Sequence, residues 1–321
     1  MVSEKERYIQ FANGNKDICI YNKPYWLDAV CGADNWNAVV IEDNDEIIAA
    51  VPYYQKKRYG IRYITQPQLT QNFDIWFKPY TGNKKEKKIE YEFDILEKVA
   101  DKFLNIDADY YIQTFSPQLI NWEPFYWKGF QQETRYTFII KKGEDYKTVL
   151  ENMSSNLKRD IKQAAKRAKI IDIDNIELFY KYNCMSFSRQ GINNPISIEL
   201  IKRLYNACKI NGACKMVAAI DDTDIHCVGF YSFDNNYVYE IMLGTDPEKR
   251  RFNFKTYMTS EMIKFACDTG RGFDFEGSMI KQIANYNRRF GSDIVPYFKL
   301  WKVKTTNVVK KAALWSKGVR F

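Results

Sequence analysis

The chain has 321 residues, 45% of them hydrophobic and 16% aromatic, which is enough to fill one large core or two ordinary ones. Its net charge of +8 admits an anionic partner but selects none. The single histidine, His226, argues against a His-based metal site or a Ser-His-Asp triad, and we expect no metal. The N-terminus has no signal-like apolar region, and no apolar run approaches the ~20 residues that span a bilayer. We therefore expect a cytoplasmic protein without a membrane span.

The first part of the chain predicts a small α/β unit. Two strands, 38–42 and 47–53, flank an acidic turn, and a third strand continues from 59 to 64. A charged segment at 83–88 then precedes a predicted helix with apolar residues on one face. A further strand is expected at 110–115, so that strands, helix and strand follow one another as in an α/β unit.

Residues 149–169 predict an amphipathic helix with one strongly basic face. Apolar residues form the opposite stripe: Leu150, Leu157, Ile161, Ala164, Ala165 and Ala168. Lys158, Arg159 and Lys162 lie on the basic face, and we take them as candidate contacts for an anionic substrate. The alternative is a surface helix whose cations only face water.

The second part of the chain repeats the same plan. Two strands, 215–220 and 225–233, again flank an acidic turn, and an aromatic-rich strand follows from Tyr237 to Leu243. Apolar residues at helical spacing predict a helix from about Phe254 to Cys267, and a short strand is expected from Phe273 to Glu276. These last three elements predict a βαβ unit.

The two parts can be aligned at one constant offset. Residues 109–117 lie over 270–278, and residues 127–130 lie over 288–291 at the same offset. Identity is low, but the order of elements agrees. We therefore predict two α/β units, 1–140 and 141–321, the second beginning with the basic helix and containing the active site.

Two short motifs near the end carry a resemblance to a known family. They are Phe273-Asp274-Phe275-Glu276-Gly277-Ser278 and Asn287-Arg288-Arg289-Phe290-Gly291. In this order and spacing, preceded by the basic segment Arg159-Asp160-Ile161-Lys162, they resemble the Fem-type (FemAB-like) acyltransferases of the GNAT superfamily. The resemblance covers nearly the whole chain, from about Pro24. It implies an α/β fold of tandem GNAT-like units, each a mixed twisted sheet flanked by helices.

The resemblance also implies a bacterial enzyme that moves an acyl or aminoacyl group to an amine. Its anionic donor would be an acyl-CoA or an aminoacyl-tRNA, and its acceptor an amine, for example on a peptidoglycan or polysaccharide precursor. Arg250, Arg251, Asn253 and Lys255 stand where the family holds the donor's phosphates.

That segment contains none of the glycines that let a backbone approach a pyrophosphate. Coenzyme A therefore fits less well than another donor. The alternative is a catalytically inactive GNAT-like module that binds a nucleotide-linked or polyanionic glycan.

Two carboxylates and two arginines are the remaining candidates. Asp274 and Glu276 alternate on one predicted strand, and alternate strand residues face the same way, so we predict that one accepts the proton of the attacking amine. Arg288 and Arg289 on the following turn are candidate substrate contacts. The alternative for Asp274 is that it anchors a neighbouring loop through backbone hydrogen bonds.

Overall fold

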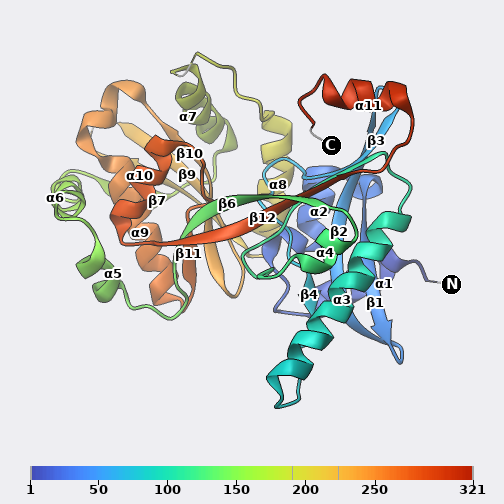
Figure 1. Ribbon diagram of the computed structural model, residues 1–321. Coiled ribbons are helices and arrows are strands. Elements are labelled where there is room, and N and C mark those ends of the chain that lie inside the picture. The colour runs from blue at the N-terminus through green and yellow to red at the C-terminus, as the bar shows by residue number, and fades with distance from the viewer. Residues whose placement is uncertain (1, 190, 223, 320–321) are drawn as a thin grey trace. The chain divides into compact units, whose positions relative to one another are not determined.

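The computed structural model describes residues 2–189, 191–222 and 224–319, and gives the backbone but not the side chains of Arg250 and Arg251. The chain forms two compact units (Figure 1). Unit 1 contains Met1–Arg135 and Pro296–Phe321, and unit 2 contains Tyr136–Val295.

Unit 1 is a mixed sheet with helices packed on it. Its strands run in the order β1, β2, β3, β5, β12, with β4 paired to β2. They are β1 (Trp36–Asp43), β2 (Glu46–Arg58), β3 (Ile61–Thr65), β4 (Trp76–Phe77), β5 (Tyr110–Thr114) and the later part of β12 (Asp293–Val303). Its helices are α1 (Glu4–Gly14), α2 (Pro24–Cys31), α3 (Lys85–Asn105), α4 (Glu123–Trp127) and α11 (Val308–Trp315).

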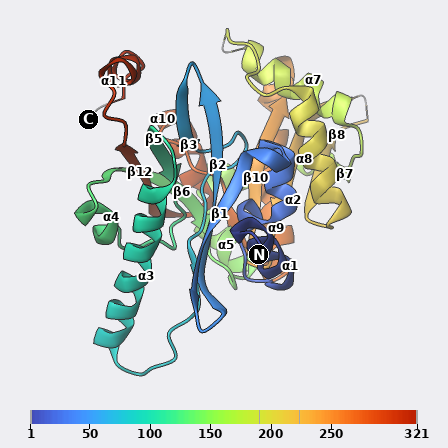
Figure 2. The same cartoon turned by 90° about the vertical axis from the view of Figure 1, so that its right-hand side faces the viewer.

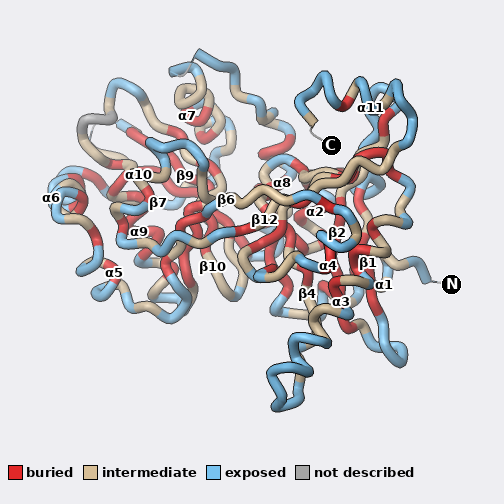
Figure 3. The backbone as a smooth tube through the Cα atoms, viewed as in Figure 1, coloured by how far each residue is buried: buried red, intermediate tan, exposed pale blue. Residues whose placement is uncertain are grey.

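The long helix α3 shows how apolar spacing positions an element of unit 1. It packs through Ile95, Leu96, Val99, Ala100 and Phe103, which follow the helical period. Figure 2 shows α3 running along the sheet, and Figure 3 shows that its first turns are exposed.

Unit 2 has the same kind of sheet, in the order β6, β11, β10, β9, β8, β7. Its strands are β6 (Gln131–Ile140, from Tyr136 onward), β7 (Lys169–Asp172), β8 (Cys214–Ile220), β9 (Ile225–Phe233), β10 (Tyr237–Thr245) and β11 (Gly272–Asp274). Its helices are α5 (Tyr146–Asn152), α6 (Ser155–Ala164), α7 (Ile176–Ser188), α8 (Ile198–Ile210), α9 (Phe254–Asp268) and α10 (Lys281–Asn287). Short 3₁₀ turns precede α9 (η3, Pro247–Phe252) and follow α10 (η4, Arg288–Phe290).

Both faces of the sheet in unit 2 are covered. Phe230 of β9 packs against Phe179 of α7 and Tyr205 of α8. Its neighbour Tyr231 points to the other face, because successive strand residues alternate, and joins the buried cluster formed with α5, α6 and α9. The region that holds the candidate site is therefore enclosed by helices on both sides.

The two units share one topology, which confirms the tandem fold. In unit 1, β1, β2 and β3 are antiparallel neighbours and β3 pairs in parallel with β5; in unit 2, β8, β9, β10 and β11 repeat these relations. In each unit one more strand pairs antiparallel beside the parallel pair: β12 pairs with β5 in unit 1, and β6 pairs with β11 in unit 2. Each of these two strands comes from the other half of the chain.

This exchange changes the division expected from sequence, which placed 141–321 in one unit. Residues Lys299–Val303 of β12 pair with β5, and α11 buries Leu314 against Ile61 and Tyr110. Pro296–Phe321 therefore belongs to unit 1. The reason is that a strand's partners are chosen by long-range pairing, which the order of elements does not reveal.

The predicted basic helix at 149–169 is instead two helices and a strand. α5 ends at Asn152, and the extended residue Ser154 precedes α6, while its N–H donates to the carbonyl of Arg289. The apolar stripe predicted for α6 is confirmed at Leu157, Ile161 and Ala164. Among the described residues, none of the helices is both long and apolar enough to cross a membrane.

Candidate active site

Unit 2 contains a cavity of about 1000 Å³. Its lining comes from the end of α7, the start of β9, the later part of β10, η3 with the first turn of α9, and α10 with the segments before and after it. The cavity thus lies where β10 and the polypeptide after β11 diverge.

The divergence follows from the pairing of the two strands. β10 and β11 pair in parallel only at Tyr237–Tyr239 with Gly272–Asp274. β11 ends there, whereas β10 continues to Thr245 along the cavity. A bulge between Glu240 and Met242 shifts the register of β10 against β9 at this point. Beyond the ladder, α7 already holds two peptide groups of β10: Asn183 Nδ2 donates to the carbonyl of Leu243, and the N–H of Thr245 donates to Ser186 Oγ. The segment 240–242, between the ladder and these two contacts, lines the cavity.

Glu240 is the central acid of this cavity. The hydroxyl of Thr259 on α9 donates to its Oε2 over 3.0 Å, and that of Tyr231 on β9 over 3.4 Å. Burial raises the pKa of Glu240 above its ordinary value of 4.5, and the nearby charge of Lys255 and the two hydroxyl groups oppose the rise. A carboxylate with a raised pKa that faces a cavity can accept a proton from a bound amine.

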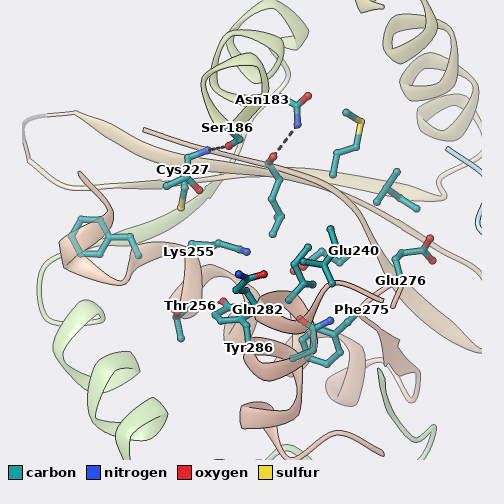
Figure 4. A pocket seen from close by; sticks show the side chains of 18 of the residues that line it. Asn183, Ser186, Cys227, Glu240, Lys255, Thr256, Phe275, Glu276, Gln282 and Tyr286 are labelled. Carbon is teal, nitrogen blue, oxygen red and sulfur yellow. Dashed lines mark hydrogen bonds between the residues drawn. The ribbon is translucent and has the colours of Figure 1, made fainter. Parts of the chain in front are cut away.

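Lys255 and Tyr286 complete a polar cluster with Glu240 (Figure 4). The ammonium of Lys255 lies 4.4 Å from the centroid of the Tyr286 ring, and the Tyr286 hydroxyl donates to Thr256 over 3.3 Å. Burial, and secondarily the negative charge of Glu240, raise the pKa of Tyr286. Its phenol therefore stays protonated and able to donate.

Four of the residues expected from sequence line the cavity: Asn253, Lys255, Glu276 and Arg289. Glu276 has a left-handed backbone, with φ of 64°, and lies beyond the end of β11. The alternation argument that placed it on one strand face with Asp274 therefore does not apply. In Figure 4 Glu276 lies apart from Lys255 and Glu240.

Asp274 is not among the described residues that line the cavity. Its contacts hold neighbouring segments together. Its Oδ1 accepts from the Thr137 hydroxyl at 2.5 Å and from the N–H of Glu276 at 2.8 Å. Burial raises the pKa of Asp274 to about 6. The side chain thus ties the end of β11 to β6 and shapes the turn that carries Glu276.

The predicted basic contacts are dispersed. Lys158 donates to the carbonyl of Glu151 over 3.1 Å, Arg159 is paired with Asp160, and Lys162 is exposed. None of these three, nor the exposed Arg288, is among the described residues lining the cavity.

Arg289 does line the cavity, and its guanidinium lies 3.5 Å from Asp160. The side chains of Arg250 and Arg251 lie outside what the structure describes, so their expected role remains a prediction.

The sequence analysis missed several polar groups of the cavity, above all Glu240 and Tyr286. A signal existed for Glu240, a carboxylate inside an otherwise aromatic and apolar strand. The structure adds two buried lining residues with unpartnered atoms, Nδ1 of His226 and Nδ2 of Asn287, which are 4% and 2% exposed. Nε2 of His226 lies 2.6 Å from the carboxylate of Asp221. Buried polar atoms normally have partners, so both are candidates for ligand contacts.

Comparison with known proteins agrees with this geometry. The family model of the acetyltransferase (GNAT) domain matches residues 151–286, which include the cavity's strand β10 and helix α9. No curated protein sequence matches the chain.

Solved structures are similar over nearly their whole length. A structure described as FemX superposes with a TM-score of 0.67 at 12% identity, covering 93% of this chain and 96% of that chain. The structure of L-PGS from Bacillus licheniformis superposes with a TM-score of 0.54 at 6% identity, covering 99% of this chain and 98% of that chain. A conserved protein of unknown function from Bacteroides thetaiotaomicron superposes with a TM-score of 0.54 at 11% identity, covering 93% of this chain and 97% of that chain. At these identities the likeness concerns the fold alone. Residues 151–286 therefore match the acetyltransferase (GNAT) domain, and the fold of the chain is similar to that of FemX.

Proposed function

We propose that the protein is an N-acyltransferase, moving an acyl or aminoacyl group from an activated donor to an amine. The observation that carries the proposal is the enclosed carboxylate of Glu240 beside the part of β10 that extends beyond its pairing with β11, within one cavity. This places a proton acceptor next to peptide groups able to stabilise an oxyanion, the two requirements of acyl transfer to an amine.

In the proposed reaction the acceptor enters as an ammonium and loses one proton to Glu240, directly or through a water molecule. The neutral amine attacks the donor's carbonyl carbon, and backbone N–H groups of β10 stabilise the oxygen of the tetrahedral intermediate. The bond from carbon to the leaving sulfur or oxygen then breaks as Tyr286 protonates the leaving atom, and the nitrogen gives its surplus proton back to the Tyr286 oxygen, which leaves a neutral amide. Tyr286, whose phenol is kept protonated, is placed to return a proton to the leaving group.

The donor segment favours an aminoacyl ester over coenzyme A. Lys255 extends into the cavity toward Glu240 (Figure 4). The segment that contains it has no glycine, so its backbone cannot approach a pyrophosphate closely. We keep both acyl-CoA and aminoacyl-tRNA as donors to be tested. The proposed acceptor is an amine of a peptidoglycan or polysaccharide precursor.

Formation of the amide product from each donor with a panel of amines, measured by mass spectrometry, tests the proposal. Glu240→Gln preserves shape and removes the base, so turnover should fall by roughly 10²–10⁴-fold. Glu276→Gln, in the same cavity, should cost less if Glu240 is the base. Glu261→Gln on α9, outside the described lining, is the matched control and should leave the rate unchanged.

The second candidate function is a binding module without catalysis, favoured by the missing glycines. It predicts that a nucleotide-linked glycan raises the melting temperature. It also predicts that no donor is consumed by the wild-type protein. Transfer activity that is lost in Glu240→Gln would exclude it.

A further inference from the structure

The last helix of unit 1 has an apolar stripe that faces solvent. In α11, Val308, Ala312 and Trp315 follow at the i, i+4, i+7 spacing of one helix face. Val308 is 78% and Trp315 71% exposed, and the neighbouring Val309 is 77% exposed. Large apolar side chains gathered in this way mark an interaction surface more often than single exposed ones do.

The stripe is not the side by which α11 is attached. Leu314 is fully buried and packs with Ile61 and Tyr110. On the same attached side, the ammonium of Lys310 lies 2.9 Å from the carboxylate of Asp109. α11 is thus held on unit 1 by one side and presents the apolar stripe with the other.

The turn between β2 and β3 extends this surface. Tyr59 at its tip is 77% exposed, and the ammonium of Lys317, just after α11, lies 5.1 Å from its ring centroid. In Figures 1 and 2 the β2–β3 end and α11 lie side by side. We call Val308, Val309, Ala312, Trp315 and Tyr59 the α11 face.

Exposed cations neighbour the residues of the α11 face in the sequence, on β2 and in and just after α11. They are Lys56, Lys57, Arg58, Lys311 and Lys317. Within the described part of the chain, none of the five has an acidic group at ion-pair distance, whereas many other surface lysines do, such as Lys78 with Glu46. The positive charge around the apolar stripe is therefore not neutralised by the protein's own carboxylates.

We propose that the α11 face docks on an anionic membrane surface. Tryptophan and tyrosine side chains favour the boundary between headgroups and acyl chains, and aliphatic side chains enter just below it. Lysines and arginines beside them gain from the negative potential of anionic lipids. A protein partner or a second copy would have to be acidic around an apolar centre, and nothing on the α11 face itself is acidic.

Flotation of the full-length protein with vesicles tests this proposal. The protein should bind vesicles of equal parts phosphatidylcholine and phosphatidylglycerol, bind pure phosphatidylcholine little, and be released by high salt. Val308→Ser with Trp315→Ser should abolish binding, whereas Ile120→Ser, an 81% exposed residue elsewhere in unit 1, should not.

The contribution of charge is tested with variants of equal net charge. Lys311→Glu with Lys317→Glu should weaken vesicle binding at least about tenfold, because each basic residue near the surface contributes to it. Lys84→Glu with Lys85→Glu, exposed at the start of α3, should have a much smaller effect.

Either of two results would overturn the proposal. One is equal binding to anionic and neutral vesicles, or to neither. The other is a dimer, seen by analytical ultracentrifugation, that the Val308 and Trp315 changes abolish, which would assign the face to a second copy. Unchanged circular dichroism and melting temperature establish that each variant is folded.

Discussion

Lys255 and Glu240 form the pair of opposite charges that sets the ionisation of the proposed base. The positive charge of Lys255 opposes the effect of burial on the pKa of Glu240. Since a base must be ionised, kcat/KM should rise with pH through the raised pKa of Glu240. Lys255→Met removes the opposing charge, so this limb of the profile should move to higher pH.

The measurement is the pH profile of kcat/KM for wild type and variant with one donor and acceptor. Lys264→Met, an exposed lysine on the same helix, is the control and should leave the profile in place. An unshifted limb in Lys255→Met would mean that another group than Glu240 titrates.

Asp274 gives a stability prediction of its own. Its pKa is raised from 3.8 to about 6, so its contribution to stability is complete below pH 3.8 and is lost as the pH rises through about 6. That shift corresponds to roughly 3 kcal/mol. The amide oxygen of Asp274→Asn can still accept from Thr137 and from the N–H of Glu276. The variant should therefore be more stable than wild type near pH 7, and the difference should shrink toward pH 4.

Urea unfolding at several pH values measures this difference. Asp274→Ala separates charge from hydrogen bonding, since it leaves both donors unpaired and should lower stability by about 1–3 kcal/mol. A variant Asp274→Asn that is less stable than wild type at neutral pH would show that the charge itself stabilises the turn.

At the level of elements, local periodicity predicted β10 and α9 well. The helix expected from about Phe254 to Cys267 is α9, Phe254–Asp268, because its apolar face packs into one cluster. The strand expected from Phe273 to Glu276 ends at Asp274, and the backbone of Glu276 adopts a left-handed conformation beyond it.

The local pattern could not identify Glu240 as the central acid. Its environment depends on Thr259 and Lys255 of a following helix, which are brought to it only by tertiary packing. The Fem-type motifs point to the region of the cavity, because Glu276 and Arg289 line it. They also indicated Asp274, which lies outside the described lining and accepts hydrogen bonds from Thr137 and from the N–H of Glu276.

The contact between α7 and β10 fixes one wall of the cavity, and it depends on Gly244. A Cβ atom there would lie 2.5 Å from the backbone of Tyr182 and of Asn183, too close for either helix or strand to stay in place. Gly244→Ala should lower stability by about 1–3 kcal/mol and also reduce acyl transfer, since Asn183 and Leu243 line the cavity.

Thermal unfolding and steady-state rates test this. Gly14→Ala, where an added Cβ meets nothing within 4 Å, is the control and should be near neutral. A Gly244→Ala protein with normal stability and rate would contradict the close approach of the two elements.

At the scale of the whole molecule, the constant offset of the repeat anticipated the shared topology. The expected strand at 110–115 is β5, and its counterpart at the same offset is β11. What the repeat could not show is the exchange of the final strands. β6 and β12 follow equivalent elements in each half, and either pairing satisfies the same alternation of buried and exposed residues.

Leu300 of β12 tests which unit the end of the chain stabilises. It is fully buried, and its register partner is Gln113 of β5 in unit 1. Leu300→Ala should lower the stability of unit 1 by about 2–5 kcal/mol, the range for a buried leucine. Native-state hydrogen exchange should therefore accelerate at the amides of β2, β3 and β5, and change little at those of β8 and β9.

Leu204 in α8 is an equally buried leucine of unit 2, so Leu204→Ala is the matched control. Its amide exchange should show the reverse pattern, faster in β8 and β9 and little changed in β2, β3 and β5. A division of the chain at residue 140 predicts that both variants act on the second half, because both residues follow that boundary. If Leu300→Ala accelerated exchange in β8 and β9 and spared β5, the assignment of Pro296–Phe321 to unit 1 would be wrong.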